Sequence, residues 1–216
     1  MSNQTRHSRV IIRNMTKDDI PKIVELQKAA FPHMAAEGVY WKPDQLEAHL
    51  EIFPEGQFVA DYNGKIVGSC SSLIVKFDPE YKEHSWKEAC GDSYFKGHDP
   101  KGDSLYGADI STHPDNRRLG VATKLYNARK ILATKLNLRR IIAGARLFNY
   151  CEFAKELTPL EYVQKVKKHE IKEPVLEFQL RNGFKFIKIL DNYMKDPRSL
   201  NHATFIEWIN PNYTAK

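Results

Sequence analysis

The stretch THPDNRRLGVATKLYNARK, residues 112–130, constrains the fold of this 216-residue chain more than any other feature. The β-branched segment before it, SLYGADIST, runs toward Pro114, which cannot donate a hydrogen bond within a sheet. After Gly120, four apolar residues recur at helical spacing: Val121, Leu125, Ala128 and Leu132. The sequence therefore predicts a strand, a short basic turn and a helix in immediate succession.

The basic turn DNRRLG has the chemistry of an anion site. The first N–H groups of a helix lack intrahelical partners, and the helix dipole is positive at that end. Gly120 would let a phosphate approach the backbone without a Cβ in the way, and the forks of Arg117 and Arg118 match phosphate oxygens. An ordinary surface turn is the alternative. The spacing alone does not decide, because neither GxxxxGK[ST] nor GxGxxG occurs.

The rest of the chain alternates short apolar strands with amphipathic helices. Strands are expected at residues 10–13, on both sides of Asn63-Gly64, and at 104–112, 138–147, 184–190 and 203–209. Helices are expected at residues 15–31, 42–53, 158–170 and 174–184, and from Gly120 onward. Residues 32–41 break the first helix. This order predicts an α/β (α+β) fold, a mixed sheet flanked by helices in one domain of residues 1–216 with a core at 9–209.

Several local signals support these elements. Asn63-Gly64 is a strong hairpin signal, and residues 138–147 are apolar enough for a middle strand. The last two strands alternate like antiparallel edge strands with one wetter face. Thr16 with Asp19, and Thr158 with Glu161, have capping-box spacing. Pro43 and Pro159 suit first helical turns, and Asn182-Gly183 suits a left-handed helix end.

Composition excludes several classes of protein. The formal charge of +6 suits an acidic ligand, but the basic residues are spread along the chain, which disfavours a dedicated nucleic-acid binder. Cys70, Cys90 and Cys151 form no CxxC pair, so a reducing interior is expected. No segment approaches the roughly 18 apolar residues of a membrane span, and no signal-peptide core precedes residue 10. These features predict a cytoplasmic protein without a membrane partner.

The phrase RRLGVA resembles the Q/R-x-x-G-x-G/A signature of the GCN5-related N-acetyltransferases (GNAT). LEFQLRNGFKF resembles that family's later helix, turn and strand, and the resemblance covers Arg9 to Trp208. FPEGQFVAD, GSCSSLIV and LYGADI resemble more specifically the acetyltransferase domain that some bacterial proteins join to a nitrilase-like domain. The resemblance implies a mostly antiparallel sheet of about seven strands whose central strands splay apart.

The resemblance also implies acetyl-CoA as co-substrate and no metal. The loop backbone would hold the diphosphate, and the strand end before it would pair with the pantetheine. The next strand would diverge at Gly144 to admit the thioester, although a plain β-bulge is an equal alternative there. The implied cofactor-binding residues are Ile110, Ser111, Thr112, Arg117, Arg118, Leu119, Gly120, Val121, Ala122 and Gly144.

The catalytic groups are less clearly indicated. Many relatives carry, where this chain has Gln179, a tyrosine that acts as general acid toward the leaving thiolate. Here Tyr150 or a water would protonate the thiolate, or the thiolate would leave without a general acid. Asp109 is the candidate base, ahead of Asp103, because an acidic residue within YGADIS must be paired or functional if buried. A structural hydrogen-bond acceptor is the alternative for Asp109. His113 is expected to be a turn residue.

The acceptor side is the least specified part of the chain. A small-molecule or peptide amine is expected, bound near the loop of residues 78–103 and the insertion of residues 147–173, which a dimer contact could also use. His84, His98 and Asp99 lack regular zinc spacing. Four loop aromatics would line a pocket or pack the loop: Tyr81, Trp86, Tyr94 and Phe95. Tyr40-Trp41 would face substrate or the core. The resemblance thus favours an acetyl-CoA-dependent N-acetyltransferase that acts on an amine by direct transfer. The two alternative hypotheses are a non-catalytic CoA-binding module and an RNA-contacting protein.

Overall fold

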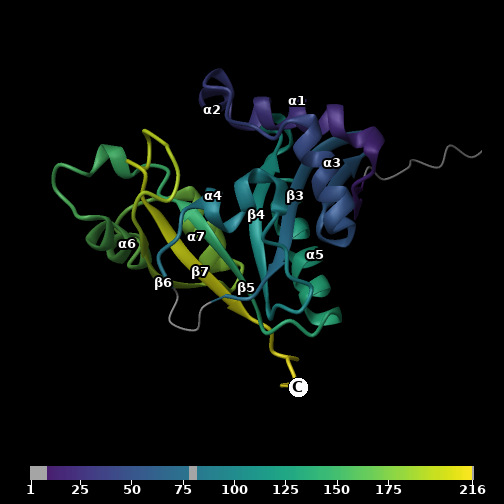
Figure 1. The fold of residues 1–216 in the computed structure, drawn as a ribbon. Coiled ribbons are helices and arrows are strands. Elements are labelled where there is room, and N and C mark those ends of the chain that lie inside the picture. Colours follow the sequence, from purple (N-terminus) through teal and green to yellow (C-terminus); the bar gives the residue numbers. More distant parts are fainter. Residues whose placement is uncertain (1–8, 78–81, 216) are drawn as a thin grey trace, which may run out of the picture. The chain divides into compact units, whose positions relative to one another are not determined.

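A computed structural model describes residues 9–77 and 82–215, and its fold is a mixed α/β sheet flanked by helices (Figure 1). The seven strands lie in the order β1-β2-β3-β4-β5-β7-β6 and are mostly antiparallel. Their bounds are β1 Val10–Asn14, β2 Phe58–Tyr62, β3 Lys65–Val75, β4 Ser104–Thr112, β5 Arg140–Arg146, β6 Lys185–Leu190 and β7 Ala203–Ile209. The predicted fold class is confirmed.

The helices follow the predicted positions closely. Their bounds are α1 Ile20–Ala30, α2 Pro32–Ala36, α3 Pro43–Ile52, α4 Trp86–Ala89, α5 Val121–Lys135, α6 Pro159–Lys167 and α7 Pro174–Arg181. Residues 32–41 break the first helix as predicted, since α1 ends at Ala30. Within them Pro32 opens the short α2 directly after Phe31, which the sequence did not indicate. Within the ranges that the structure describes, no helix is long and apolar enough to cross a membrane.

Internal contacts divide the chain into two compact units. The first consists of Met1–Ser71 with Asp109–Ala128, and the second of Ser72–Ala108 with Arg129–Lys216. Each unit is therefore discontinuous in sequence, and the boundary passes through β3, β4 and α5. The single domain of residues 1–216 stays a prediction, and the units are described separately below.

In the first unit, the hairpin of β2 and β3 turns at Asn63 and Gly64, whose φ angles are +55° and +83°. Two successive left-handed residues are typical of a type I′ turn, as the Asn-Gly pair predicts. The apolar core of this unit combines the strands with the start of α5: Val10, Ala60, Val67, Cys70, Val121 and Leu125.

A capping box starts the first helical segment of this unit. Asp19 accepts hydrogen bonds from the N–H and the hydroxyl of Thr16, both at 2.9 Å. The Arg13 guanidinium donates to the two oxygens of Asp19 at 2.6 and 2.8 Å. The bond from Arg13, with help from Thr16, lowers the pKa of Asp19 to about 2.

We expect Asp19→Asn to lower the free energy of unfolding by about 1–2 kcal/mol at pH 7, since Arg13 is itself partly exposed. A carboxyl group whose pKa falls on folding stabilises the fold above its unfolded pKa of about 3.9. That contribution disappears as the pH falls through about 2. Urea unfolding should therefore show the two proteins converging in stability between about pH 4 and pH 2.

The exposed neighbour Asp18 provides the matched control. Asp18→Asn should change stability little at either pH, because surface substitutions away from such contacts are usually neutral. Equal losses for the two variants would contradict the assignment to the Arg13–Asp19 pair.

In the second unit, β5 lies between β4 and β7, so the predicted middle strand is confirmed. Its parallel ladder with β4 runs from Ser104–Arg140 to Tyr106–Ile142. The prediction that both closing strands are edge strands was wrong for β7, which pairs with β5 and β6 on its two sides. The polar residues of β7 account for this: the buried Glu207 carboxylate accepts a bond from Arg140 on β5 at 3.1 Å.

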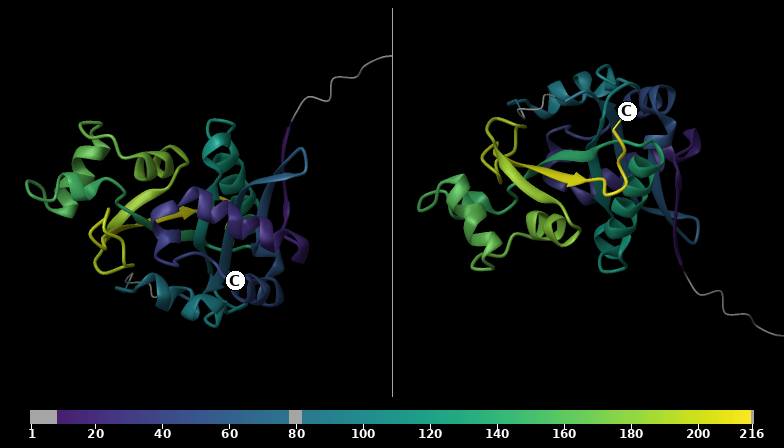
Figure 2. Two further views of the ribbon diagram at one scale, coloured as in Figure 1. Left: turned by 90° about the horizontal axis from the view of Figure 1, so that it is seen from above. Right: turned by 90° about the horizontal axis from the view of Figure 1, so that it is seen from below.

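The long loop and the insertion both belong to the second unit. In the loop, α4 and a turn at Gly91–Phe95 are the only regular pieces among residues 82–103, and Phe95 and Cys90 are fully buried. The insertion carries α6 beside the β6–β7 pair, as the views from above and below agree (Figure 2). Both segments are therefore packed against the sheet of this unit.

Candidate functional site

A tight turn precedes the glycine loop in the first unit. The His113 N–H donates to the Val67 carbonyl at 2.9 Å and ties the end of β4 to β3. The His113 ring Nδ1 accepts from the Asp115 N–H at 3.3 Å, and the Arg117 N–H turns back to the Pro114 carbonyl at 3.3 Å. His113 is thus a turn residue, as expected from the sequence.

The loop itself is open and left-handed at two positions. Arg118 and Gly120 both have φ of +71°, and a Cβ on Gly120 would meet nothing within 4 Å. The first helical bond runs from the Lys124 N–H to the Gly120 carbonyl at 3.0 Å. The amides of residues 121–123 therefore lack acceptors within α5, which leaves backbone donors at the positive end of its dipole. This geometry suits an anion.

Gly68 on β3 fixes the position of this helix start. A Cβ at Gly68 would lie 2.5 Å from Val121 Cγ1 and 3.2 Å from Leu125 Cδ1. Val121 and Leu125 are buried in the core of the first unit. The loop is thus held by apolar packing beneath it, while the side chains of residues 117–120 are exposed.

The strand segment Ile110–Thr112 leads into this turn. The Ile110 side chain packs against the core of the first unit, and Ser111 is 1% exposed. The Ser111 hydroxyl donates to Asp109 at 3.1 Å. Because the side chains of Ile110 and Ser111 contact the protein itself, the backbone of this segment is the part available to a ligand. The predicted pairing with pantetheine requires backbone groups.

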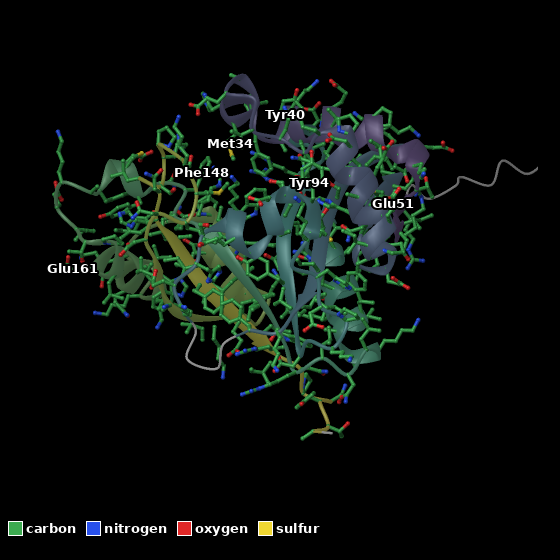
Figure 3. The ribbon with its side chains drawn as sticks, viewed as in Figure 1. Met34, Tyr40, Glu51, Tyr94, Phe148 and Glu161 are labelled. Carbon is green, nitrogen blue, oxygen red and sulfur yellow. The ribbon has the colours of Figure 1, made fainter. Side chains whose placement is uncertain are left out.

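Asp109, the predicted base, belongs to a polar group that also involves α1. The Gln27 Nε2 donates to Asp109 Oδ2 at 3.0 Å, while the Gln27 Oε1 accepts from the Trp41 N–H at 2.8 Å. Gln27 is therefore held at both ends, and it orients the carboxylate of Asp109. Trp41 is 4% exposed and packs edge-on against His49, so its core alternative is the correct one. Tyr40 is labelled with Met34 in Figure 3, and the Lys42 Nζ lies 3.3 Å from the centroid of the Tyr40 ring.

Gly144, in the second unit, has a close neighbour that the sequence did not indicate. A Cβ at Gly144 would lie 2.5 Å from the Tyr193 hydroxyl oxygen and closer still to the tyrosine ring. The pairing of β5 with β7 continues unbroken from Arg140–Ile209 to Arg146–Ala203, so the β-bulge alternative was wrong. The role of Gly144 at a thioester stays a prediction.

Tyr150, the predicted acid, lies in the insertion. Its hydroxyl donates to the Leu157 carbonyl at 2.9 Å, and its side chain is 4% exposed. The nearby Glu173 is fully buried and accepts from the Tyr162 hydroxyl at 2.9 Å and the Asn149 N–H at 3.0 Å. Burial raises the pKa of Glu173. Tyr150 is therefore held within the insertion, and its catalytic role stays a prediction.

Gln179 lies on α7 and is 5% exposed. The helix ends in a Schellman motif: the Phe184 N–H bonds the Gln179 carbonyl at 3.1 Å, and Gly183 has φ of +81°. The left-handed helix end is thus confirmed at Gly183.

Two candidate side chains of the long loop form hydrogen bonds with strand backbones. The Trp86 indole donates to the Ala108 carbonyl at 2.9 Å, and the His98 Nδ1 accepts from the Ile74 N–H at 3.1 Å. Tyr81 lies outside the described residues. Among the described ones, no group of three or more histidine, cysteine or acidic side chains could hold a metal ion.

In this sheet, β4 leads through a glycine loop into the exposed start of α5. This arrangement is the one expected of the acetyltransferase class whose signature RRLGVA resembles. The model of the acetyltransferase (GNAT) family matches residues 20–150. The chain belongs to the GNAT acetyltransferase family.

Two relatives from Bacillus subtilis (strain 168) align with nearly the whole chain. It is 46% identical over 206 residues to the probable hydrolase YhcX, covering 95% of this chain but 39% of that protein. It is 38% identical to the uncharacterized N-acetyltransferase YkwB, covering 94% of this chain and 89% of that protein. The chain thus spans well under half of the first relative and most of the second.

Solved structures share the fold at low sequence identity. The loading GNATL domain of CurA from Lyngbya majuscula has a TM-score of 0.78 at 17% identity, covering 93% of this chain and 97% of its own. The GphF GNAT-like decarboxylase with isobutyryl-CoA has 0.75 at 19%, covering 92% and 98%. YncA, a putative acetyltransferase from Salmonella typhimurium with acetyl-CoA, has 0.59 at 17%, covering 95% and 96%.

Three neighbours of the predicted site escaped the sequence analysis. Gly68 supports the loop, Gln27 holds Asp109, and Tyr193 covers Gly144. Gly68, within an apolar run, was the one with a local signal, since a glycine inside a strand often marks a close approach. Gln27 and Tyr193 lie 82 and 49 positions from their partners, beyond the reach of local patterns.

Proposed function

We propose that the protein is an acetyl-CoA-dependent N-acetyltransferase that moves an acetyl group directly to an amine. The observation that carries the proposal is the loop of residues 117–122, an open backbone anion site at the start of α5 in a member of the GNAT family. Relatives and fold neighbours named for acetyltransfer or bound to acyl-CoA support it.

The residues of the first unit divide the binding task. The amides at the start of α5 would hold the diphosphate, with the side chains of Arg117 and Arg118 adding charge. The backbone of Ile110–Thr112 would pair with the pantetheine. When bound, acetyl-CoA supplies the activated thioester carbon. Asp109, oriented by Gln27 and Ser111, would hold the incoming amine or take its proton.

The acceptor belongs to the proposal as a class only, a small-molecule or peptide amine. The insertion of residues 147–173 would contact this acceptor or a second copy of the chain in a homodimer. No disulfide joins Cys70, Cys90 or Cys151, which fits a reducing compartment, so we propose a cytoplasmic location.

Calorimetry with acetyl-CoA tests the binding half of the proposal. We expect one site per chain with a dissociation constant on the order of 1 μM to 1 mM, since enzymes typically have KM values near the cellular concentration of the substrate. Release of free CoA thiol in the presence of a panel of amines tests transfer. Absence of acetyl-CoA binding would refute the proposed function, whereas binding without thiol release from any amine would favour a non-catalytic CoA-binding module.

A second candidate is loss of CO₂ from a carboxylated acyl-CoA. It is favoured by the higher TM-score of the GphF GNAT-like decarboxylase, 0.75, against 0.59 for YncA. Incubation with malonyl-CoA in place of acetyl-CoA would separate the two activities, because decarboxylation releases CO₂ and leaves the thioester intact, whereas acetyl transfer releases the CoA thiol.

A further inference from the structure

A buried chain of hydrogen bonds connects Gly144 to His84 within the second unit. The Tyr193 and Tyr106 hydroxyls are 2.8 Å apart, and the Tyr106 hydroxyl lies 3.1 Å from the His84 Nε2. Tyr106 is fully buried and Tyr193 is 2% exposed, whereas His84 is only half-buried. Solvent therefore reaches this chain at the histidine end.

The backbone sets the direction of these bonds. The His84 Nδ1 lies 3.1 Å from the Lys82 carbonyl, which can only accept, so Nδ1 carries the proton of the neutral ring. The Nε2 must then accept from the Tyr106 hydroxyl, and the Tyr106 oxygen accepts from the Tyr193 hydroxyl. Every proton in the chain is thus directed away from Gly144 and toward His84.

The inner end of the chain lies where the parallel ladder stops. The β4–β5 register ends at Tyr106–Ile142. Two residues further, the Gly144 N–H donates hydrogen bonds to both tyrosine oxygens. Gly107 faces Arg129 of α5 and lies beside the Ala143 Cβ, so Gly144 faces the opposite side of β5, toward Tyr193. The Tyr193 oxygen keeps a lone pair beside the strand that is predicted to admit the thioester.

The three groups are in the protonation states that such a chain needs. Burial lowers the pKa of His84 and raises the pKa of Tyr106 and of Tyr193. The charged and titratable groups that face the chain are Glu83, Glu88, Lys188 and the buried Cys90 thiol. Glu83 is paired with Lys188 at 2.8 Å and Glu88 with Ser85 at 2.7 Å. At neutral pH the imidazole is therefore free to accept a proton.

We propose that Tyr193, Tyr106 and His84 form a proton relay that accepts the proton of the attacking amine, an inference that rests on the proposed acetyltransfer. The amine nitrogen bonds the thioester carbon while its proton passes to the Tyr193 oxygen. Tyr193 gives its own proton to Tyr106, and Tyr106 gives its proton to the His84 Nε2. The C–S bond breaks, the thiolate leaves with the electron pair, and the imidazolium releases its proton to solvent. Tyr193 is the catalytic residue, and Tyr106 and His84 act through it.

The relay predicts a specific effect of removing single hydroxyls. Tyr193→Phe and Tyr106→Phe should each lower kcat about 100-fold, within the range of general-base catalysis, with the KM for acetyl-CoA unchanged. The acidic limb of the kcat–pH profile, set by His84 in the wild type, should be lost in both. Tyr126→Phe is the matched control, because it also removes the hydroxyl of a buried tyrosine, 3% exposed on α5 and outside the relay, and should keep normal kcat.

A measurement without acetyl-CoA tests the chain itself. Nitrogen-15 NMR of the free protein should show His84 as the Nδ1–H tautomer, titrating below an exposed histidine. Tyr106→Phe should raise that titration, because it removes a bond to the neutral ring. An Nε2–H tautomer would overturn the relay even if a variant fails to fold.

The outcomes separate the relay from the proposed function. If the wild type transfers acetyl groups and both phenylalanine variants keep its kcat and pH profile, the relay is wrong and the proposed function stands. If the wild type does not bind acetyl-CoA, the proposed function fails and the relay fails with it.

Discussion

Replacing Gly120 by tryptophan should weaken acetyl-CoA binding at least about 100-fold while the protein stays folded. A Cβ on Gly120 meets nothing within 4 Å, so an indole would extend into the open space above the loop and not into the core. That space is where the diphosphate of the proposed acetyl-CoA would approach the amides at the start of α5. Calorimetry with acetyl-CoA measures the loss directly.

Gly64 supplies a matched control in the same unit. Its φ of +83° resembles the +71° of Gly120, and a Cβ there also meets nothing within 4 Å. Gly64→Trp should therefore cost the same backbone strain, about 1 kcal/mol of stability, and leave acetyl-CoA affinity unchanged. Gly120→Ala should show the strain with little loss of binding. Unchanged affinity in Gly120→Trp would refute the assignment of this loop.

Local patterns predicted most elements of the fold. The Asn63-Gly64 turn, the Thr16–Asp19 and Thr158–Glu161 capping boxes and the Gly183 helix end all depend on residues within a few positions of one another. The structure places each of them as expected. Such short-range signals determine where elements begin and end, but they do not determine which strands become neighbours.

The interior position of β7 shows the limit. Glu207 makes this strand look solvent-facing, yet its carboxylate is neutralised by Arg140, 67 positions earlier in the chain. A buried charge with a distant partner resembles a surface charge until the partner is known. The edge position predicted for β7 was therefore wrong because a long-range ion pair reverses the meaning of the pattern.

The site divides in the same way. The loop of residues 117–122 is contiguous, so all of its residues can be identified from the sequence alone. The partners of Asp109 and Gly144 come from other elements: Gln27 from α1, and Tyr193 from the segment after β6. The surroundings of Asp109 in the first unit and of Gly144 in the second therefore depend on contacts that only the folded chain assembles.

Gly144→Ala should be among the most destabilising single-methyl additions in the second unit, lowering the free energy of unfolding by about 3 kcal/mol. The new Cβ would lie 2.5 Å from the Tyr193 hydroxyl oxygen and closer to its ring, in a region where Tyr193 is 2% exposed. The ring would have to move, and the bond between the Tyr193 and Tyr106 hydroxyls would break with it. Urea unfolding measures the loss.

Gly97, where a Cβ meets nothing within 4 Å, is the matched control in the same unit. Gly97→Ala should be neutral or stabilise slightly, because it only restricts the unfolded chain. The decisive comparison is a double-mutant cycle. If Tyr193 is the cause, Gly144→Ala should add almost nothing in a Tyr193→Ala background, a coupling of about 2–3 kcal/mol. Simple additivity would show that the tyrosine is not what requires a glycine at position 144, and the thioester would then be the remaining occupant to test at that face of β5.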